Sequence, residues 1–251
     1  ITVNAQPTVT FSALSSVCAD RPWVTLSGGS PTGGTYSGTG VSGGQFDPGT
    51  AGAGTYSLTY TYTDGNSCTD SASQNITVHA QPTVSFPAMS DVCIDNGIVT
   101  LSGATPTGGT YSGTGVTGTS FDPSVSGAVT HTLKYIYTDG NTCTDSATQT
   151  ITVNGLPTVS LSNYSDICAG APKLTLTGGT PTGGTYTGTG VSSGEFDPSV
   201  AGVGTHKIFY SYTDGNSCQN QDSATITVNA QPTVTFSALS SVCAGAPNVT
   251  L

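Results

Sequence analysis

Positive charge is scarce in this sequence: four Lys and Arg stand against fourteen Asp and Glu, for a net charge of −10 over 251 residues. A protein that binds nucleic acid needs a basic patch to neutralise phosphates, and an anionic membrane surface attracts clusters of Lys and Arg. Four scattered cations build neither surface. The composition therefore excludes a nucleic-acid partner and disfavours binding to an anionic membrane surface.

Long apolar runs are also missing. No run approaches the roughly 18 apolar residues that span a bilayer, so we expect no membrane insertion in this segment. Apolar residues at helical spacing are absent as well. Instead, 34 Gly and 14 Pro punctuate runs rich in Thr, Tyr and Val. This pattern predicts an all-β protein made of short strands joined by turns.

The sequence repeats itself at a constant interval. Ile-Thr-Val begins at Ile1, Ile76, Ile151 and Ile226. Pro-Thr-Val, Gly-Gly-Thr-Tyr, Phe-Asp-Pro and Tyr-Thr-Asp-Gly-Asn recur in the same register. So regular a period indicates duplication of one folding unit, and it does not suit a multidomain enzyme, whose parts would differ.

The period sets the expected domain boundaries. Residues 1–6 would end a preceding repeat, residues 7–81, 82–156 and 157–231 would be three complete repeats, and residues 232–251 would begin a fourth. The sequence shows no initiator Met and no signal peptide. We therefore expect it to be a stretch of a longer protein.

One predicted strand stands out in each repeat. Residues Thr55–Thr63 alternate strictly, which is the mark of a strand with one buried face. Asp64-Gly65-Asn66 predicts a tight hairpin turn, and a second strand would run from Cys68 to Val78. Further strands are expected near Thr8–Phe11, Val24–Ser27, Gly34–Gly38 and Gly44–Phe46. Six or so short antiparallel strands predict an immunoglobulin-like β-sandwich.

Short proline-containing linkers separate the repeats. Pro7, Pro82, Pro157 and Pro232 each follow a strand by a few residues. Proline fixes its own backbone and holds the preceding residue extended, so these joints are stiffer than Gly/Ser linkers. With about 35 Å for each repeat, three repeats would form an extended rod of roughly 100 Å.

Seven cysteines recur at intervals that alternate between a longer spacing and one half as long. There is no Cys-x-x-Cys pair and no Cys/His cluster, which speaks against zinc. Regular cysteine pairs in small β repeats favour disulfides and an oxidising, extracellular location. The positions are Cys18, Cys68, Cys93, Cys143, Cys168, Cys218 and Cys243.

Two disulfide pairings fit these intervals. Pairing between repeats would join Cys68 to Cys93 and so on, but extended flanking strands would hold those sulfurs tens of Å apart, whereas a disulfide needs Cα atoms within about 7 Å. We therefore expect pairing within repeats and Cys243 without its partner. The expected bonds are Cys18–Cys68, Cys93–Cys143 and Cys168–Cys218.

Repeated aspartates are the candidates for a metal site. Asp64, Asp139 and Asp214 could be calcium ligands, but calcium needs several oxygen ligands and each of these aspartates precedes a glycine in a turn. We favour the turn and expect no metal and no cofactor. Asp47, Asp122 and Asp197 precede prolines, which also favours turns.

Nothing in the repeat predicts catalysis. A nucleophile, a base and an orienting group do not recur together at one place in every repeat, so we expect no catalytic residue and no enzyme. His131 and His206 occupy the position of Tyr56 and are expected to be either packed residues or strand-end residues. Trp23 could stack on a sugar, but Lys173 stands at its place in the third repeat, which favours a solvent-facing position.

The repeat resembles a known family. Gly-Gly-Thr-Tyr-Ser-Gly-Thr-Gly-Val, Phe-Asp-Pro, Tyr-Thr-Tyr-Thr-Asp-Gly-Asn-Ser-Cys and Ile-Thr-Val, in this order, are similar to the immunoglobulin-like or PKD-like repeats of very large surface proteins of Bacteroidota. These proteins include the SprB-type gliding adhesins that the type IX secretion system exports. The resemblance covers the whole chain and implies a cell-surface adhesion protein.

The same resemblance implies a modification site. Asp-Ser-Ala occurs once in each complete repeat and is similar to the O-glycosylation signal of Bacteroidota. The candidate residues are Ser71, Ser146 and Ser223. The third copy lies two residues late, a shift that keeps a strand residue on the same face. The alternative is an unmodified polar strand position.

Three function classes remain open. The favoured one is structural: the stalk or filament shaft of a large cell-surface adhesin that serves attachment or gliding. The second is an array of modules that bind glycans or other surface proteins. The third is a set of accessory repeats in a secreted polysaccharide-degrading enzyme. In each case the expected partners are neighbouring repeats and, for the second class, surface glycans or proteins.

Overall fold

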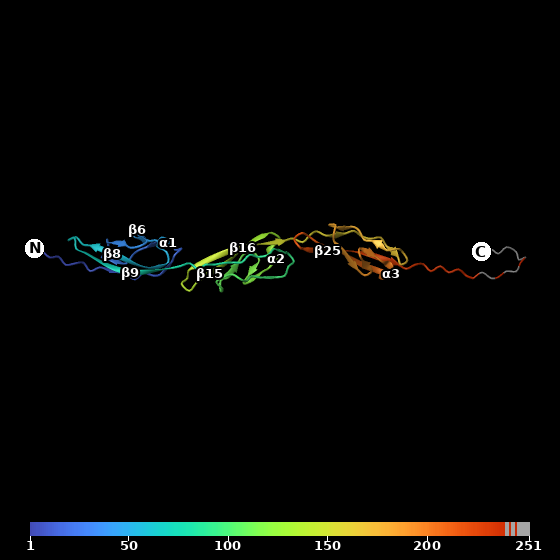
Figure 1. Cartoon of the computed structure of the whole chain (residues 1–251), viewed down its shortest axis with the longest axis horizontal. Coiled ribbons are helices and arrows are strands. Elements are labelled where there is room, and N and C mark those ends of the chain that lie inside the picture. The colour runs from blue at the N-terminus through green and yellow to red at the C-terminus, as the bar shows by residue number, and fades with distance from the viewer. Residues whose placement is uncertain (239–240, 242–243, 245–251) are drawn as a thin grey trace. The chain divides into compact units, whose positions relative to one another are not determined.

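The computed structural model describes residues 1–238, 241 and 244. The chain forms two compact units, residues 1–154 and 155–251. The first unit contains two copies of one all-β sandwich and the second contains a third copy (Figure 1). In the described part, no helix has the length and the apolar character that a membrane crossing requires.

A long antiparallel hairpin is the largest element of each copy. In the first, β8 (Gly54–Thr63) pairs with β9 (Thr69–His79) over its whole length, from Gly54 opposite Val78 to Thr63 opposite Thr69. The predicted strand and turn are therefore confirmed. The equivalent hairpins are β15 (Thr130–Thr138) with β16 (Thr144–Asn154), and β24 (Gly204–Thr213) with β25 (Gln219–Asn229).

Two short strands complete the four-stranded sheet around this hairpin. β5 (Thr35–Ser37) pairs antiparallel with β8, and β2 (Val17–Cys18) pairs parallel with the end of β9. The parallel strand differs from the all-antiparallel expectation. A parallel pair needs a long crossover connection, and the chain between β2 and β9, which contains most of the repeat, supplies it.

The second layer is smaller. β3 (Val24–Thr25), β7 (Gln45–Phe46) and β6 (Val41–Ser42) form a three-stranded sheet, and β1 (Thr10–Phe11) pairs with β4 (Gly29–Ser30). In the second copy the three-stranded sheet consists of β11 (Val99–Thr100), β14 (Ser120–Phe121) and β13 (Val116–Thr117), and a single bridge joins Ser85 and Thr105; β10 (Val92–Cys93) and β12 (Thr110–Ser112) belong to the four-stranded sheet. In the third copy the three-stranded sheet consists of β19 (Leu174–Thr175), β23 (Glu195–Phe196) and β22 (Val191–Ser192), and β17 (Ser160–Leu161) pairs with β20 (Gly179–Thr180); β18 (Ile167–Cys168) and β21 (Thr185–Gly188) belong to the four-stranded sheet.

The Phe-Asp-Pro motif begins a single helical turn instead of a plain turn. Asp47 caps α1 (Pro48–Ala51): its carboxylate accepts hydrogen bonds from the backbone N–H of Gly49 and Thr50. Proline suits the first helical position because its missing N–H would have had no partner there. The hydrogen bond from the Thr50 hydroxyl lowers the pKa of Asp47. Asp122 and Asp197 cap α2 (Pro123–Ser126) and α3 (Pro198–Ala201), where each accepts one backbone N–H and one hydroxyl, from Ser124 and Ser199.

Each repeat buries its own hydrophobic core between its layers. In the first, Phe46 and Leu58 are fully buried, and Ile76 and Val78 are 2% exposed. The alternation of β8 sends its apolar side chains to one face, and each buried side chain contributes about 1.5–3 kcal/mol by leaving water. Separate cores also form in the second and third repeats. The copies therefore do not share a core, as expected for tandem repeats.

A buried tyrosine fastens the Pro-Thr-Gly-Gly loop in every repeat. The Tyr60 hydroxyl donates to the Pro31 carbonyl at 2.7 Å and accepts from the Gly34 N–H at 2.7 Å. Tyr135 makes the same two bonds in the second repeat and Tyr210 in the third. Position 34 requires glycine, because a Cβ there would collide with the Thr61 carbonyl and the Tyr60 ring.

We expect Tyr135→Phe to lower the free energy of unfolding of its repeat by about 1–3 kcal/mol. The ring would stay packed, but the carbonyl of Pro106 and the N–H of Gly109 would lose their partner. Urea unfolding followed by circular dichroism measures the change. Tyr137→Phe is the control, because that hydroxyl makes no hydrogen bond within the described residues. Equal effects of the two substitutions would contradict the role of the Tyr135 hydroxyl.

Candidate functional site

The feature with the clearest functional meaning is a disulfide between two neighbouring repeats. Cys18 of the first repeat is bonded to Cys143 of the second, with the Cα atoms 5.5 Å apart and a sequence separation of 125 residues. A loop of this length would stabilise the folded pair by about 5 kcal/mol in the chain-entropy account of cross-links. We call this region the disulfide joint.

Each half of the joint is positioned by the long hairpin of its repeat. Cys18 lies opposite His79 at the end of β9, and the Ala19 N–H donates to the His79 carbonyl at 2.9 Å. Cys143 directly precedes β16 and follows the hairpin turn, at the opposite end of the sheet. The bond therefore connects the exit end of one repeat to the turn end of the next.

The structure corrects the expected pairing within repeats. Cys18 is bonded to Cys143, while Cys68 and Cys168 carry free thiols, so none of the bonds Cys18–Cys68, Cys93–Cys143 and Cys168–Cys218 forms. Cys93 and Cys218 are disulfide-bonded. Cys243 lies outside the described residues.

The physical reason for the correction is the length of β9. Cys68 precedes the first residue of this strand, and Cys18 pairs at its last residue. Eleven extended residues separate the two positions by about 35 Å, far beyond the reach of a disulfide. The distance argument that excludes Cys68–Cys93 therefore excludes Cys18–Cys68 as well. The intervals also allow a third pairing, which joins a cysteine of one repeat to a cysteine near the end of the next.

The turn that carries Cys143 is held by Asp139. One oxygen of its carboxylate accepts the N–H of Asn141 at 2.8 Å and the N–H of Cys143 at 2.9 Å. The bond from Cys143 is the largest cause of a lowered pKa at Asp139, and the charge of His79, from the first repeat, lowers it further. Thr142 adopts a positive φ of 67°, an uncommon conformation for a β-branched residue. The hydrogen bonds of Asp139 thus hold a strained turn in the shape that presents Cys143.

Asp64 and Asp214 make the same two hydrogen bonds in their own turns. Turn chemistry therefore accounts for the candidate calcium ligands. Within the described residues, no three His, Cys, Asp or Glu side chains gather as metal ligands would.

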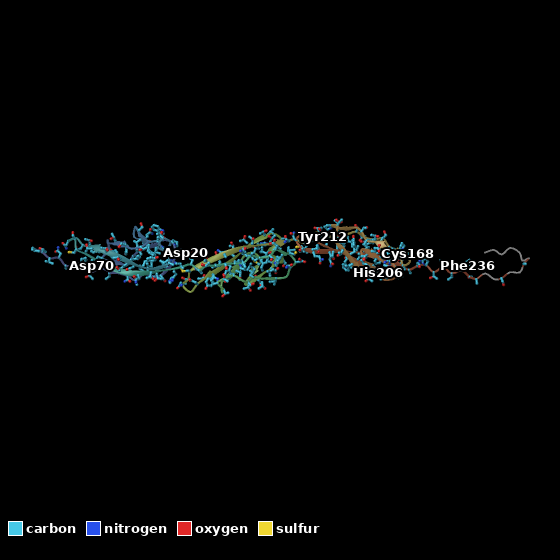
Figure 2. All side chains as sticks on the ribbon, viewed as in Figure 1. Asp20, Asp70, Cys168, His206, Tyr212 and Phe236 are labelled. Carbon is cyan, nitrogen blue, oxygen red and sulfur yellow. A yellow bond between two sulfur atoms is a disulfide. The ribbon has the colours of Figure 1, made fainter. Side chains whose placement is uncertain are left out.

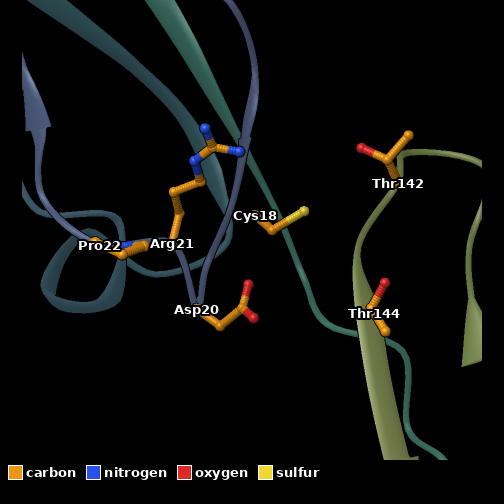
Figure 3. A pocket seen from close by; sticks show the side chains of 6 residues that line it. All are labelled: Cys18, Asp20, Arg21, Pro22, Thr142 and Thr144. Atoms are coloured by element: carbon orange, nitrogen blue, oxygen red, sulfur yellow. The ribbon is translucent and has the colours of Figure 1, made fainter. Parts of the chain in front are cut away.

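An open cleft lies beside the disulfide joint. It measures about 450 Å³ and is lined by Cys18, Asp20, Arg21 and Pro22 from the first repeat, and by Thr142 and Thr144 from the second (Figure 3). Arg21 also borders a second hollow of about 530 Å³ under residues 12–17. Asn96 and Ala171 stand where Arg21 stands in the other repeats. Asp20 is matched by Asp95 in the second repeat but by Gly170 in the third, so no charge of the cleft recurs in all three repeats.

The remaining candidate residues have structural positions. His131 is 8% exposed and its ring Nε2 lies 2.9 Å from the Gly127 carbonyl, and His206 makes the same contact with Gly202. Their expected packing is confirmed; the Tyr56 hydroxyl makes the equivalent bond in the first repeat. Trp23 is 53% exposed, which confirms its solvent-facing position.

The Asp-Ser-Ala motif divides between the two faces of its strand. Asp70 turns inward and accepts from the Val9 N–H at 3.4 Å, whereas the neighbouring Ser71 is exposed (Figure 2 labels Asp70). In the third repeat Asp222 accepts from the Leu161 N–H at 2.8 Å, and this bond lowers its pKa. The two-residue shift therefore keeps the aspartate on the inner face, where it fastens the first strand. Ser146 and Ser223 are half-buried.

No protein-family model and no curated protein matches the sequence of this chain. Among solved structures, it is similar to a Ca²⁺-stabilised adhesin with which an Antarctic bacterium binds ice, at 15% identity over 90% of this chain and 74% of that one, with a TM-score of 0.42. A second bacterial ice-binding adhesin is 14% identical over 74% and 78% of the two chains, with a TM-score of 0.32. Immunoglobulin domains 1–4 of Sidekick-1 are 12% identical over 88% and 74%, with a TM-score of 0.25. At these scores the likeness decides no ligand and no activity.

Substitutions of Asp139 distinguish a turn from a calcium site. We expect Asp139→Asn to retain most of the stability, because an amide oxygen can accept the same two N–H groups, and Asp139→Ala to lower the melting temperature. Because its pKa is lowered in the folded state, Asp139 stabilises the fold above its ordinary pKa near 4, and this contribution disappears as the pH falls through the lowered value. Asp139→Asn should therefore lose part of the acid sensitivity.

Melting temperatures with calcium and with a chelator complete this test. We expect them to be equal for the unsubstituted chain. A higher melting temperature in calcium that Asp139→Asn abolishes would contradict the turn and restore the metal-site alternative for Asp64, Asp139 and Asp214.

Proposed function

We propose that the chain is a structural repeat region, the stalk or filament shaft of a large bacterial cell-surface adhesin that serves surface attachment or gliding motility. The observation that carries this proposal is the disulfide joint. A covalent bond between neighbouring repeats stiffens their connection and bears load beside the backbone linker. Both properties suit a spacer, and neither is needed by a set of independent binding modules.

The chemistry of the joint supports an extracellular location. Disulfides form and persist in oxidising surroundings and are rare in the cytosol. Cys18, Cys93, Cys143 and Cys218 are all bonded. The low content of charged residues also suits an extracellular protein, because its stability then depends little on the salt concentration around it. The described residues contain a single salt bridge, between Lys173 and Asp197, so stability rests on packing and covalent bonds that salt does not screen.

An array of glycan- or protein-binding modules is the second candidate, and one surface favours it. The outer face of the first hairpin carries uncharged hydroxyl groups in cross-strand pairs, such as Thr59 with Ser73 at 2.9 Å and Thr63 with Thr69 at 2.9 Å. This face is not repeated, however. Ile136 replaces Thr61 in the second repeat and Phe209 replaces Thr59 in the third. A ligand bound by every repeat would need the same face in each, so we favour the shaft.

The shaft proposal predicts an extended particle in solution. Three repeats of about 35 Å each give a rod of roughly 100 Å, with a radius of gyration of about 30 Å. A compact chain of this length would have a radius of gyration of about 18 Å. Small-angle X-ray scattering of the whole chain measures this radius, and a result that matches the compact chain would contradict the spacer.

The cellular test is to shorten the array in the source bacterium by one, two or three whole repeats. We expect the protein to stay on the surface, while an epitope at its outer end moves toward the cell by a constant step for each deleted repeat. Attachment should weaken with length. If attachment is lost with the first repeat removed and reach is unchanged, the repeats bind the target themselves and the second candidate is correct.

We further propose that Ser71, Ser146 and Ser223 carry O-glycans in the native protein. Ser71 is exposed and Ser146 and Ser223 are half-buried, and alternation along the strand places Ser71 and Ser223 on the face opposite the inward Asp70 and Asp222. Glycopeptide mass spectrometry of protein from the source bacterium should show a glycan at each serine and none at Ser73, which is also on the outer face but lacks a preceding aspartate. Unmodified peptides at all three sites would contradict the proposal.

A further inference from the structure

Every repeat contains both halves of a disulfide joint. We call Cys18, Cys93 and Cys168 the strand cysteines, because each ends a short strand parallel to the last strand of its repeat. We call Cys68, Cys143 and Cys218 the turn cysteines, because each follows a hairpin turn. In the first unit, the strand cysteine of one repeat is bonded to the turn cysteine of the next.

The strand half has the same geometry in the third repeat as in the first. Cys168 lies opposite Asn229, and the Ala169 N–H donates to the Asn229 carbonyl at 2.9 Å. Cys18 lies opposite His79, and the Ala19 N–H donates to the His79 carbonyl at 2.9 Å. Cys168 differs only in carrying a free, exposed thiol (Figure 2). The third repeat therefore holds its strand cysteine in the geometry of the bonded Cys18, but the thiol of Cys168 is not bonded to a turn cysteine.

The turn half also recurs. The Cys68 N–H donates to Asp64 at 2.9 Å, and Ser67 before it has a positive φ of 61°, which matches Asp139 and Thr142 beside Cys143. The burial differs: Cys143 is 1% exposed and Cys218 is fully buried, whereas Cys68 is only partly buried. The same turn thus covers its cysteine where that cysteine is bonded and leaves it accessible where it is a thiol.

The sequence period explains which cysteines are thiols. Cys93 and Cys218 stand at the same two positions as Cys18 and Cys143, with the same separation, and both are disulfide-bonded. For Cys168 and Cys68 the same separation leads beyond Leu251 and before Ile1. Cys168 and Cys68 are therefore the two described cysteines for which a partner at this separation would lie outside residues 1–251.

We propose that the disulfide joint recurs along the whole array, so that Cys93 bonds Cys218, Cys168 is the attachment point for the turn cysteine of a following repeat, and Cys68 is the attachment point for the strand cysteine of a preceding one. Each bond forms when two thiols give up two protons and two electrons to a small-molecule disulfide, which is reduced to two thiols. The proposal does not depend on the adhesin function and fails separately from it.

The recurring joint would make the array nearly inextensible. The shortest covalent path crosses the disulfide from a strand cysteine to a turn cysteine. It then follows the backbone to the next strand cysteine, as from Cys143 to Cys168, and crosses the next disulfide there. Every two repeats then transmit load through about 85 Å of chain, even when fully unfolded. Two folded repeats measure about 70 Å. Without the bonds, the same two repeats would extend to about 500 Å.

The first experiment completes the fourth repeat. Adding a second copy of residues 177–231 after Leu251 places a copy of Cys218 about 125 residues beyond Cys168, as in the first unit. Thiol alkylation and non-reducing peptide mapping should show Cys168 labelled in the original chain, but protected and bonded to the added cysteine in the longer chain. In the longer chain with Cys168→Ser, the added cysteine should be labelled. If Cys168 stays labelled, or the added cysteine bonds Cys243, the proposal is wrong.

The second experiment uses the whole original chain, stretched from its two ends in a single-molecule instrument. Cys68, Cys168 and Cys243 are replaced by serine, so that only the two proposed bonds remain. Overlapping bonds leave about 100 residues in the load path, against about 250 after reduction, a change of about 2.5-fold in final length.

Overlap also has a signature that separate bonds lack. Cys18→Ser or Cys93→Ser alone should lengthen the path by about 25 residues each, but the two together by about 150 residues. The serine background without either change, reoxidised and stretched again, is the matched control. If the two substitutions together lengthened the path only by the sum of their single steps, the bonds would not overlap and the proposal would be overturned.

Discussion

The pairing of the two long strands in each repeat is the constraint on which the rest of the structure depends. β9 is eleven residues long and pairs with β8 from end to end. It therefore fixes the distance between the turn, where Cys68 lies, and the exit, where Cys18 lies. Since no disulfide spans that distance, Cys18 and Cys68 cannot bond each other, and Cys18 instead bonds Cys143 of the next repeat.

The sequence predicts the large elements of this fold well and the joint poorly. Strict alternation over residues 55–63 identifies β8, and the apolar face it predicts is the buried one. The two-residue strands β2, β4 and β6 carry too few residues to show any period. Without β2, nothing in the sequence places Cys18 beside His79, so the sequence alone does not show that Cys18 and Cys68 lie at opposite ends of β9.

The aspartates show why residue type alone did not assign the sites. Asp47, Asp64 and Asp70 all belong to repeated motifs, yet one caps a helical turn, one shapes a hairpin turn and one fastens the first strand. All three accept backbone N–H groups that would otherwise lack partners in short loops and strands. A repeat with few hydrophobic residues and many turns needs such acceptors, which accounts for the repeated acidic positions without a ligand.

Differences among the repeats separate what the joint requires from what the surface tolerates. Arg21, beside the disulfide joint, and the exposed Trp23 give way to Asn96 and Ile98, and to Ala171 and Lys173. The features that aim the cysteines stay constant: the turn aspartate, the positive φ before the turn cysteine, and the parallel pairing of the strand cysteine. A recognition surface replicated for binding would show the reverse, with constant exposed side chains and freedom in the linkage. The geometry held fixed along this chain is that of the cysteines, one pair of which joins the first repeat to the second.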